Sequence, residues 1–385
     1  MNYKDNFDIV IGIPALNEEE TIKKIVEVFD ASLQKYFPNK KTVLILLDSN
    51  SKDKTVEFFN NTKTVVQKIV IRNLKKGKGR NIINLLKFSI KNNVKCVCMV
   101  DADIKNVNIS WLYKFINPII NNEADFILPI YKRGKFSGNI TNLICRPVLY
   151  GLYGTFITQP IGGDFSFNSN YAIFILNKIK SVKQNMRHIV NSFGIDIFMT
   201  YYCLVGKYKY KEVDLGEKLD KPGFFHMDQI FEEVCLTLFY LISENSIINI
   251  EKQPIKYIEF IKDAKPYTDV DLLERKKAAL SLRDNFKKNN LNIYLYNKLD
   301  IKSLEEKDLI KSDDFDNLIV KIIRLLQSDG NLRNIRLIEI IKTIRPYFHL
   351  RVYSYFKDIE NKEPKEVEGM LLRSCKFMRK KILNT

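Results

Sequence analysis

Two aspartates, Asp101 and Asp103, follow a run of apolar residues and are separated by a single alanine. The apolar run at residues 96–100 is typical of a strand buried on both faces of a parallel sheet. Residues i and i+2 of an extended chain point to the same side, so both carboxylates can face one ligand. In open α/β sheets, ligands bind outside the carboxyl ends of the strands. The pair therefore predicts a seat for a hard divalent cation that also holds a diphosphate.

A short basic loop, Gly77-Lys78-Gly79-Arg80, carries a second set of residues suited to a charged ligand. Its glycines let the backbone approach a phosphate, and Lys78 adds positive charge. The spacing fits neither a Walker loop nor a dinucleotide fingerprint. A basic surface turn would explain the same residues, so both interpretations stay open.

A third loop, at residues 159–164, combines a proline and two adjacent glycines with a polar residue at each end, Gln159 and Asp164. Gly162 and Gly163 together allow close approach to a bulky ligand such as a sugar ring. A type II turn alone would need only one of them. The composition of this loop therefore favours a sugar-binding segment.

Polar residues also follow other predicted strands. Asn17 and Glu18 come after the first strand, behind Pro14, and either side chain could accept a hydrogen bond from a nucleotide base or ribose. A helix start with a proline and an asparagine cap explains them equally well. Asp48 ends the second strand and is either a turn residue or a partner of a uracil or ribose. Asp196 precedes an apolar helix, as an N-cap or as a group that bonds sugar hydroxyls.

An alternation of strand and helix patterns must position these residues. Apolar runs and amphipathic repeats predict strands at 8–13, 43–47, 65–71, 96–100 and 125–130, and helices at 18–33, 81–90 and 111–120. Repeated strand-helix-strand units imply a parallel sheet with right-handed crossovers and helices on both faces. After about residue 220 the pattern changes to amphipathic helices, expected at 226–243, 271–288, 314–326, 335–344 and 365–383. We therefore expect an α/β catalytic domain over residues 1–225 and a helical region over residues 226–385.

Composition limits the classes of function. The chain has 385 residues, of which 45% are hydrophobic, enough for a packed core. A net charge of +17 suits nucleic acid, an acidic membrane surface or phosphorylated small molecules, or simply reflects solvated lysines. No RNA-binding signature or zinc-finger spacing occurs, so we expect no nucleic-acid partner.

Three features indicate a soluble cytoplasmic protein without a transmembrane segment. The six cysteines are scattered, which is typical of core residues in a reducing compartment. The longest apolar stretch, at residues 234–242, is far shorter than the roughly 20 residues that cross a bilayer. The polar N-terminus has no signal-peptide core.

Taken in order, these motifs resemble the metal-assisted, nucleotide-sugar-dependent glycosyltransferases of the GT-A fold. The closest likeness is to the retaining glucosyl-3-phosphoglycerate synthases and mannosylglycerate synthases. The similar segments lie at residues 13–18, 76–79, 101–104, 139–147, 159–164, 194–197 and 214–221. The resemblance implies a Rossmann-like, mainly parallel sheet with helices on both faces, followed by a helical C-terminal region. It also implies transfer of a hexose, with retention, from a nucleotide-diphosphate sugar to a small anionic acceptor such as 3-phosphoglycerate or glycerate.

The resemblance further implies roles for individual residues. The nucleotide-sugar-binding residues would be Pro14, Asn17, Glu18, Asp48, Lys78, Asp101, Ala102, Gly162 and Gly163. The catalytic residues lining the sugar pocket would be Gln159, Asp164 and Asp196, and the acceptor contacts would be Arg133, Thr141 and Gly163. Asp103 would hold the metal, Mg²⁺ or Mn²⁺.

At two positions the chain departs from the pattern of this family. The family's second metal ligand is a histidine, where this chain has Asp220. An aspartate oxygen suits Mg²⁺ or Mn²⁺, so we expect Asp220 as the second ligand, with His226 as the alternative. The phosphoglycerate enzymes carry an arginine two residues before the threonine, where this chain has Asn139. Arg133 remains as an anion-binding group, so glycerate or another small anion is as plausible an acceptor as 3-phosphoglycerate.

Other functions stay open at this stage. One alternative is a GT-A glycosyltransferase acting on a lipid-phosphate or polysaccharide acceptor at the membrane surface, which the basic charge would favour. Processive polymer synthases carry a Gln-x-x-Arg-Trp motif, and the only tryptophan here, Trp111, is not in such a motif. A nucleotidyltransferase would need a glycine-rich basic loop directly after the first strand, and a non-enzymatic adaptor would not need the aspartate pair. Apolar faces on the C-terminal helices would permit a homodimer.

Overall fold

The computed structural model describes residues 6–220, 227–245, 258–261, 268–289, 292–328 and 335–383. The chain divides into two compact units. The first unit comprises Met1–Tyr131 and Gln159–Lys221, and the second comprises Lys132–Thr158 and Pro222–Thr385. The two-domain expectation placed everything up to residue 225 in one domain, whereas the structure groups Lys132–Thr158 with the C-terminal helices.

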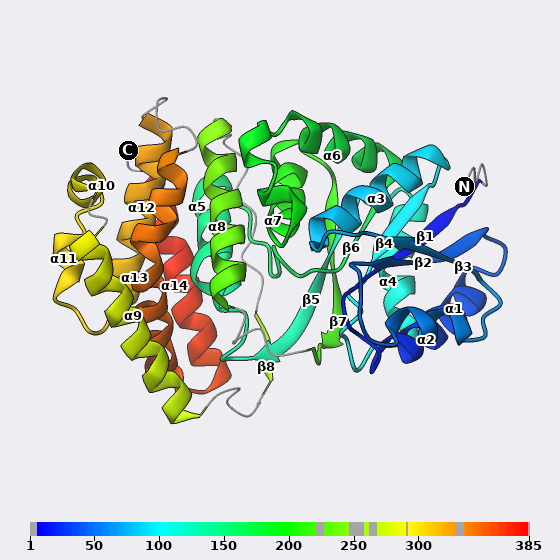
Figure 1. Ribbon diagram of the computed structural model, residues 1–385, viewed down its shortest axis with the longest axis horizontal. Coiled ribbons are helices and arrows are strands. Elements are labelled where there is room, and N and C mark those ends of the chain that lie inside the picture. The colour runs from blue at the N-terminus through cyan, green and yellow to red at the C-terminus, as the bar shows by residue number, and fades with distance from the viewer. Residues whose placement is uncertain are drawn as a thin grey trace. The chain divides into compact units, whose positions relative to one another are not determined.

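A mainly parallel sheet forms the centre of the first unit (Figure 1). Its strands, in the order β3-β2-β1-β4-β6-β5-β7, are β1 (Ile9–Ala15), β2 (Thr42–Asp48), β3 (Gln67–Arg72), β4 (Cys96–Met99), β5 (Phe126–Gly134), β6 (Phe165–Asn168) and β7 (Tyr210–Glu217). Parallel pairs join β1 to β2, β2 to β3 and β1 to β4, while β6 runs antiparallel to β4 and β5. The strand patterns expected in the first half of the chain are confirmed, and the sequence analysis did not identify β6 and β7.

The register of these strands brings the candidate loops to one edge of the sheet. Ala15 at the end of β1 lies beside Asp48 at the end of β2, and Gly12 lies beside Met99 at the end of β4. The segments that follow β1, β2 and β4 therefore leave the sheet at the same edge. This is the edge at which open α/β sheets bind ligands.

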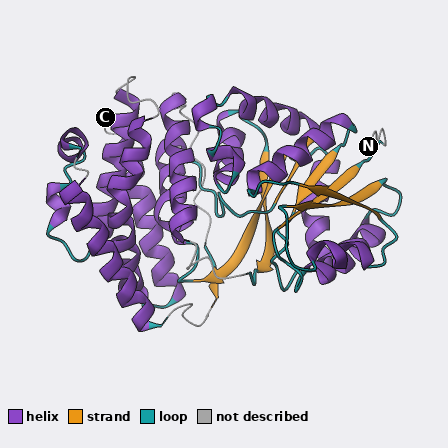
Figure 2. Cartoon of the chain, viewed as in Figure 1, coloured by secondary structure: helices purple, strands orange, loops and turns teal. Residues whose placement is uncertain are grey.

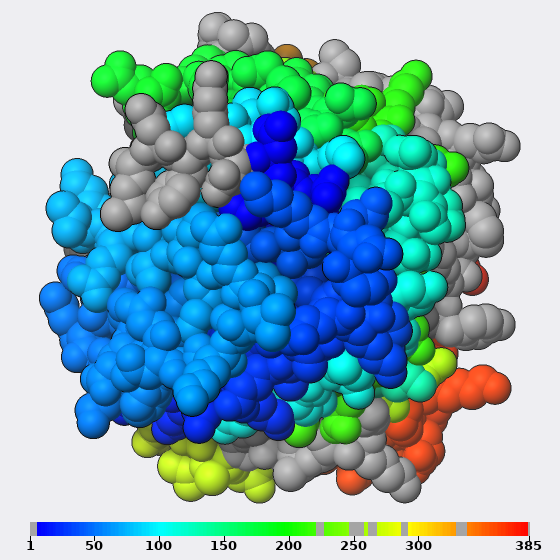
Figure 3. Space-filling model, turned by 90° about the vertical axis from the view of Figure 1, so that its right-hand side faces the viewer, coloured from blue at the N-terminus to red at the C-terminus, as the bar shows by residue number. Residues whose placement is uncertain are grey.

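Helices cover both faces of the sheet, as Figure 1 shows. On one side lie α1 (Ile22–Tyr36), α2 (Thr55–Asn61) and α4 (Ile109–Ile120), and on the other lie α3 (Lys78–Lys91), α6 (Ser169–Ser181) and α7 (Gly194–Val205). Apolar stripes explain the packing: Ile22, Ile25 and Phe29 of α1 are fully buried in the core beneath the sheet. The face of the molecule seen in Figure 3 is formed largely by residues of the N-terminal part of the chain, coloured blue.

The second unit is almost entirely helical (Figure 2). Its elements are a π-helical turn (Thr141–Cys145), α5 (Arg146–Tyr153), α8 (Met227–Glu244), β8 (Phe260–Ile261), α9 (Asp269–Asn289), α10 (Ile293–Lys298), α11 (Lys302–Glu305), α12 (Ser312–Ser328), α13 (Ile335–Ile359) and α14 (Pro364–Leu383). The end of α5 is held by α14, because Arg379 donates hydrogen bonds of 3.0 Å to the carbonyl oxygens of Gly151 and Leu152. In the part of the chain that the structure describes, no helix is both long enough and apolar enough to cross a membrane.

Candidate active site

A buried lysine joins two carboxylates at the carboxyl edge of the sheet. Lys78 Nζ lies 2.9 Å from Asp101 Oδ1, 3.2 Å from Asp196 Oδ2 and 3.2 Å from the carbonyl oxygen of Gly163. Lys78 is the first residue of α3, Asp101 follows β4, and Asp196 lies in the first turn of α7. Burial alone would lower the pKa of Lys78, but Asp101 and Asp196 raise it above its ordinary value, so the side chain is an ammonium. The structure thus brings together three residues that the sequence analysis selected from separate motifs.

The glycines on either side of Lys78 allow two backbone segments to approach closely. A Cβ atom on Gly77 would lie 2.2 Å from the carbonyl oxygen of Asn191, and one on Gly79 would lie 2.0 Å from that of Val190. Gly77 also has a φ of 137°, which side chains disfavour. From the sequence, a phosphate approach and a basic surface turn were both open for these glycines. In the structure they seat the start of α3 against the turn at Ile189–Asn191. That packing fixes the direction in which Lys78 points.

The second glycine pair brings its loop against the Lys78–Asp101 ion pair. Gly163 has a φ of 86°, and a Cβ there would lie 2.3 Å from Asp101 Oδ2 and 3.0 Å from Lys78 Nζ. A Cβ on Gly162 would lie 2.7 Å from Pro129 Cγ. Gln159 is buried, and its carbonyl oxygen accepts the Gly162 N–H at 3.1 Å to close the turn. Both glycines therefore allow close packing against protein groups, and the approach of a sugar ring expected for this loop stays a prediction.

Asp164 is completely buried, and both of its oxygens are engaged by protein groups. Oδ1 accepts the backbone N–H of Asp101 at 2.7 Å, and Oδ2 accepts hydrogen bonds from Lys218 Nζ at 2.8 Å and from the Tyr131 hydroxyl. Burial would raise the pKa of Asp164, but the Lys218 and Lys78 ammonium groups and the Tyr131 hydroxyl together hold the pKa below its ordinary value. This geometry favours a role in holding Asp101 over the catalytic role expected from the resemblance.

Asp196 has one buried carboxylate oxygen that no described group satisfies. The residue is 6% exposed, Oδ2 pairs with Lys78, and Oδ1 has no hydrogen-bond partner among the described residues. Burial raises the pKa of Asp196, although Lys78 opposes the shift. A buried acceptor without a partner costs free energy, so a ligand group that donates to Oδ1 would be favoured. A sugar hydroxyl is such a group.

The expected metal ligands lie on two loops that hydrogen bond to each other. The loop after Asp103 and the loop before Asp220 are joined by Lys105 N–H, which donates to the Leu219 carbonyl at 2.9 Å, and by Leu219 N–H, which donates to Asn106 Oδ1 at 2.9 Å. Within the described ranges, the partly exposed Asp103 carboxylate forms no hydrogen bond or ion pair, so its oxygens are available to a cation. Burial is the main cause that raises the pKa of Asp101, to about 7.

The described residues fit Mg²⁺ or Mn²⁺ only together with a ligand. They contain no group of three His, Cys, Asp or Glu side chains close enough to hold a metal ion. Asp220 Oδ2 lies 3.9 Å from Lys218 Nζ, and the alternative ligand, His226, lies outside the described residues. Mg²⁺ is commonly bound through one or two carboxylates plus substrate phosphates and waters. Asp101 and Asp103 supply hard oxygen donors of that kind.

The expected nucleotide-binding loops are tied to one another. Asn17 has a φ of 58°; its N–H donates to Ser51 Oγ at 2.9 Å, and its Oδ1 accepts the Lys52 N–H at 2.8 Å. The Glu18 N–H donates to Thr55 Oγ1 at 2.7 Å. These bonds hold the loop after β1 against the loop after β2, so both face the same edge of the sheet.

Asp48 and the residues around Ala102 complete this edge. Asp48 is 1% exposed; its Oδ1 accepts the Ser51 N–H at 3.1 Å, and its Oδ2 lies 3.7 Å from Arg72 Nε. The Ala102 N–H donates to the Pro14 carbonyl at 3.3 Å, which ties the aspartate pair to the first loop. The first unit therefore holds all of the nucleotide-sugar-binding residues expected from the sequence.

The two expected acceptor residues outside the sugar loop belong to the second unit. Arg133 lies near the end of β5 and pairs with Phe260 of β8. Thr141 is buried at the start of the π-helical turn. Asn139, which replaces the family's arginine, is buried and donates from Nδ2 to the Phe136 carbonyl at 3.1 Å.

Two buried residues of the site, Tyr131 and Lys218, were not predicted from the sequence. Lys218 is 2% exposed, and its Nζ lies within 4 Å of Asp101, Asp164 and Asp220. Its position two residues before the expected metal ligand Asp220 was a usable signal. Tyr131 carried no signal, since an aromatic residue in a strand usually packs in the core.

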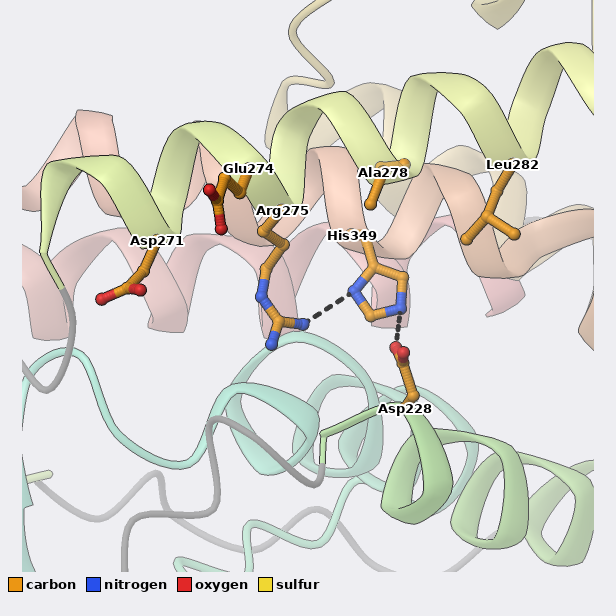
Figure 4. A pocket seen from close by; sticks show the side chains of 8 residues that line it. Asp228, Asp271, Glu274, Arg275, Ala278, Leu282 and His349 are labelled. Atoms are coloured by element: carbon orange, nitrogen blue, oxygen red, sulfur yellow. Dashed lines mark hydrogen bonds and ion pairs between the residues drawn. The ribbon is translucent and has the colours of Figure 1, made fainter.

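The second unit has a cavity of its own, drawn in Figure 4. It measures about 300 Å³ and is lined by Asp228, Asp271, Glu274, Arg275, Ala278, Ala279, Leu282 and His349. His349 Nε2 lies 2.5 Å from Asp228 Oδ1, and His349 Nδ1 lies 3.2 Å from Arg275 Nη1. Burial lowers the pKa of His349, although Asp228 opposes the shift, and the two contacts fit the neutral Nε2–H tautomer. The polar groups here pair with one another across α8, α9 and α13, so we assign the cavity no catalytic role.

Comparisons with known proteins show which proteins the first part of the chain resembles. Residues 10–179 match the model of the family "Glycosyl transferase family 2". The chain is 26% identical over 179 residues to a glucosyl-3-phosphoglycerate synthase of Petrotoga mobilis, which covers 42% of this chain and 54% of that protein. It is 24% identical over 172 residues to a glucosyl-3-phosphoglycerate synthase of Mycolicibacterium smegmatis, which covers 41% of this chain and 55% of that protein. The chain thus spans about half the length of the curated relatives it matches.

One of the solved structures that the chain matches is glucosyl-3-phosphoglycerate synthase from Mycobacterium tuberculosis, in complex with Mn²⁺, uridine-diphosphate-glucose and phosphoglyceric acid. It matches with a TM-score of 0.48 and 20% identity, over 60% of this chain and 79% of that chain. The α/β GT-A fold with an additional C-terminal helical region, expected from the sequence, is confirmed by the sheet topology and the family match.

Proposed function

We propose that this chain is a metal-dependent glycosyltransferase that moves a hexose, with retention, from a nucleotide-diphosphate sugar to a small anionic acceptor. The observation that carries this proposal is the arrangement of Lys78 between Asp101 and Asp196, with Asp103 unengaged by described residues beside it. An ammonium and a cation seat next to each other suit a diphosphate, and a buried acceptor oxygen suits a sugar hydroxyl.

Each residue has a separate task in this proposal. Asp103 and Asp101, with Asp220, would hold Mg²⁺ or Mn²⁺, which when bound stabilises the negative charge of the departing diphosphate. The Lys78 ammonium would pair with donor phosphate oxygens. Asp196 would accept a hydrogen bond from the sugar through Oδ1, the atom without a partner among the described residues. Gly163 would leave the room that the sugar loop needs beside Asp101.

The nucleotide would occupy the edge formed by the loops after β1 and β2. Asn17 and Glu18 would supply acceptor oxygens there, whereas Asp48, which is 1% exposed, would hold the loop in place through the Ser51 N–H. No residue stands out as a covalent nucleophile, so we assign none. Retention rests on the resemblance to retaining relatives.

For the acceptor, the relatives' name supports 3-phosphoglycerate, whereas the position of the family's arginine holds Asn139. We therefore propose an acceptor that carries a carboxylate and is held by Arg133, with Thr141 as a second contact. Glycerate and 3-phosphoglycerate both meet that description.

A donor and acceptor panel tests this function. Uridine- and guanosine-diphosphate sugars would be incubated with Mn²⁺ and with glycerate or 3-phosphoglycerate, and nucleotide release would be measured. We expect one donor to be consumed only when metal and acceptor are both present, and the anomeric coupling in the proton spectrum of the product to report retention. Release only with a lipid phosphate or a polysaccharide would instead support the membrane-surface alternative. No release with any acceptor, together with no binding of a nucleotide diphosphate, would overturn the proposal.

A further inference from the structure

We infer that Tyr131, Lys218 and Asp164 form a buried positioning triad that sets the conformation of the metal-binding Asp101-Ala102-Asp103 segment. The triad belongs to the first unit throughout. That the segment binds metal rests on the proposed function. The hydrogen bond from the Asp101 N–H to Asp164 does not depend on it.

The contacts of Asp164 converge on one backbone group. Lys218 Nζ at 2.8 Å and the Tyr131 hydroxyl both bond Oδ2, which leaves Oδ1 for the Asp101 N–H at 2.7 Å. The side chain of Asp164 has no exposed area, so it cannot touch a substrate directly. Asp164 therefore acts through Asp101.

The other two residues are oriented by packing. Lys218 Nζ lies 5.0 Å from the centre of the Tyr131 ring and 3.4 Å from the carbonyl oxygen of Gly162. The Tyr131 ring lies 5.5 Å from that of Trp111. The ammonium thus ties the sugar loop to the aspartate segment, and the aromatic pair limits how far the ammonium can move.

Stability alone does not explain such a network. A buried ion pair usually adds no more stability than well-packed apolar residues of the same volume. Here the buried charges fix the direction of one N–H bond, and with it the placement of the Asp101 and Asp103 carboxylates. Groups that orient a metal ligand typically change metal affinity or activity by about 10- to 100-fold when they are removed.

Tyr131→Phe is the first variant of the test, because it removes only the hydroxyl and keeps the ring against Trp111 and Lys218. The matched control is Tyr171→Phe, since Tyr171 is equally buried in the same unit and its hydroxyl donates to the Met199 carbonyl at 2.5 Å. We expect Tyr131→Phe to weaken Mn²⁺ binding by about 10-fold and to lower kcat by a similar factor with a small change in acceptor KM. The control should lose comparable stability without either change. Equal Mn²⁺ affinity in the two variants would overturn the triad.

A second measurement does not depend on the proposed function. Hydrogen exchange of the Asp101 amide, followed by nuclear magnetic resonance, reports its bond to Asp164 without metal or substrate. The double variant Lys218→Met/Asp164→Asn removes both buried charges together and so avoids leaving one of them unpaired. We expect at least 10-fold faster exchange at Asp101 in this variant and unchanged exchange in Tyr171→Phe. Unchanged exchange at Asp101 would refute the triad, whereas faster exchange with no binding of Mn²⁺ to the wild type would refute only the metal assignment.

Discussion

Lys78 engages both carboxylate oxygens of Asp101, with its Nζ 2.9 Å from Oδ1 and 3.0 Å from Oδ2. The same ammonium is proposed to pair with donor phosphates. A metal ion at Asp101 and the Lys78 ammonium therefore compete for one carboxylate until a diphosphate offers the ammonium other oxygens.

Removing the Lys78 charge should affect the donor and the metal in opposite directions. In Lys78→Met we expect donor affinity to fall by about 10- to 100-fold, because a charge-assisted hydrogen bond to phosphate is lost. Mn²⁺ measured alone should bind more tightly than in the wild type, since its competitor is gone. Titration calorimetry with Mn²⁺ and then with a uridine-diphosphate sugar checks both, and Lys87→Met, an exposed lysine of α3, is the control. Unchanged donor affinity would mean that Lys78 has a structural role and does not bind the donor.

Asp103 should be needed for metal but not for folding. Because its carboxylate has no hydrogen-bond or ion-pair partner within the described ranges, Asp103→Ala should melt within about 2 °C of the wild type when no metal is added. The stabilisation of the wild type by Mn²⁺ should disappear in the variant, and transfer should be abolished. Thermal melting with and without Mn²⁺ checks this. A variant that unfolds without metal would reveal a structural role instead.

Asp220 marks the departure from the family's histidine ligand, and two substitutions test it. Asp220→Ala should raise the Mn²⁺ concentration needed for activity, because a ligand and a compensating negative charge are both removed. Asp220→His should restore much of the activity at neutral pH and lose it as the pH falls below about 6.5, since only the neutral imidazole binds metal. Activity titrations with Mn²⁺ at pH 6 and pH 8 measure both effects. If His226→Ala alone changes the metal requirement, His226 is the ligand.

Gly163 should tolerate no side chain, because a Cβ there would collide with Asp101, and Gly216 provides a control for backbone strain alone. Gly163→Ala would place a Cβ 2.3 Å from Asp101 Oδ2, and we expect metal and donor binding to weaken by about 100-fold. Gly216 also has a positive φ, of 77°, but a Cβ there would meet nothing within 4 Å. Gly216→Ala should therefore show the same backbone strain, of about 1 kcal/mol, without the loss of binding. Similar binding in the two variants would show that strain, and not contact with Asp101, limits position 163.

The buried Asp316 in the second unit should make stability depend on pH. Burial raises the pKa of Asp316 from 3.8 to about 6, partly opposed by Ser374 and Arg351. The folded state then binds the proton more tightly than the unfolded chain, so this contribution to the free energy of unfolding falls as the pH rises from about 4 to 6. The change is about 2–3 kcal/mol.

Urea unfolding at pH 4.5 and pH 7 measures that dependence. Relative to the wild type, Asp316→Asn should gain stability as the pH is raised. Asp313→Asn, at an exposed aspartate of the same helix that contributes least to the pKa shift of Asp316, should change the difference from wild type only slightly between the two pH values. A parallel response of all three proteins would contradict ionisation of Asp316 in this range.

Helices and strands were predicted correctly from the sequence where the hydrophobic pattern that marks them is local. The apolar run before Asp101 predicted β4, and the amphipathic repeats predicted α1, because burial of one face leaves its period in the sequence. The strands β6 and β7 and the membership of Lys132–Thr158 in the second unit depend on contacts between distant segments, which no local period records.

The same limit applies to the candidate site. A lysine in a polar loop usually indicates a solvated side chain. Lys218 can be buried because distant segments supply opposite charge, above all Asp164, 54 positions earlier in the chain. The motifs could predict which loops gather at the carboxyl edge, but not that Asp164 would be occupied on both oxygens.

The contact between α5 and α14 has a consequence for the order in which the chain can fold. Arg379 and the Gly151 carbonyl that it binds are separated by 228 positions. During synthesis, the carbonyl groups at the end of α5 therefore gain their Arg379 hydrogen bonds only after nearly all later residues have been made. The segments of the first unit, in contrast, are complete by residue 221. Domains generally fold as units, with the N-terminal one first. The segment Lys132–Thr158, inserted in the first unit, would then remain exposed on the ribosome while the helices that cover it are still being made.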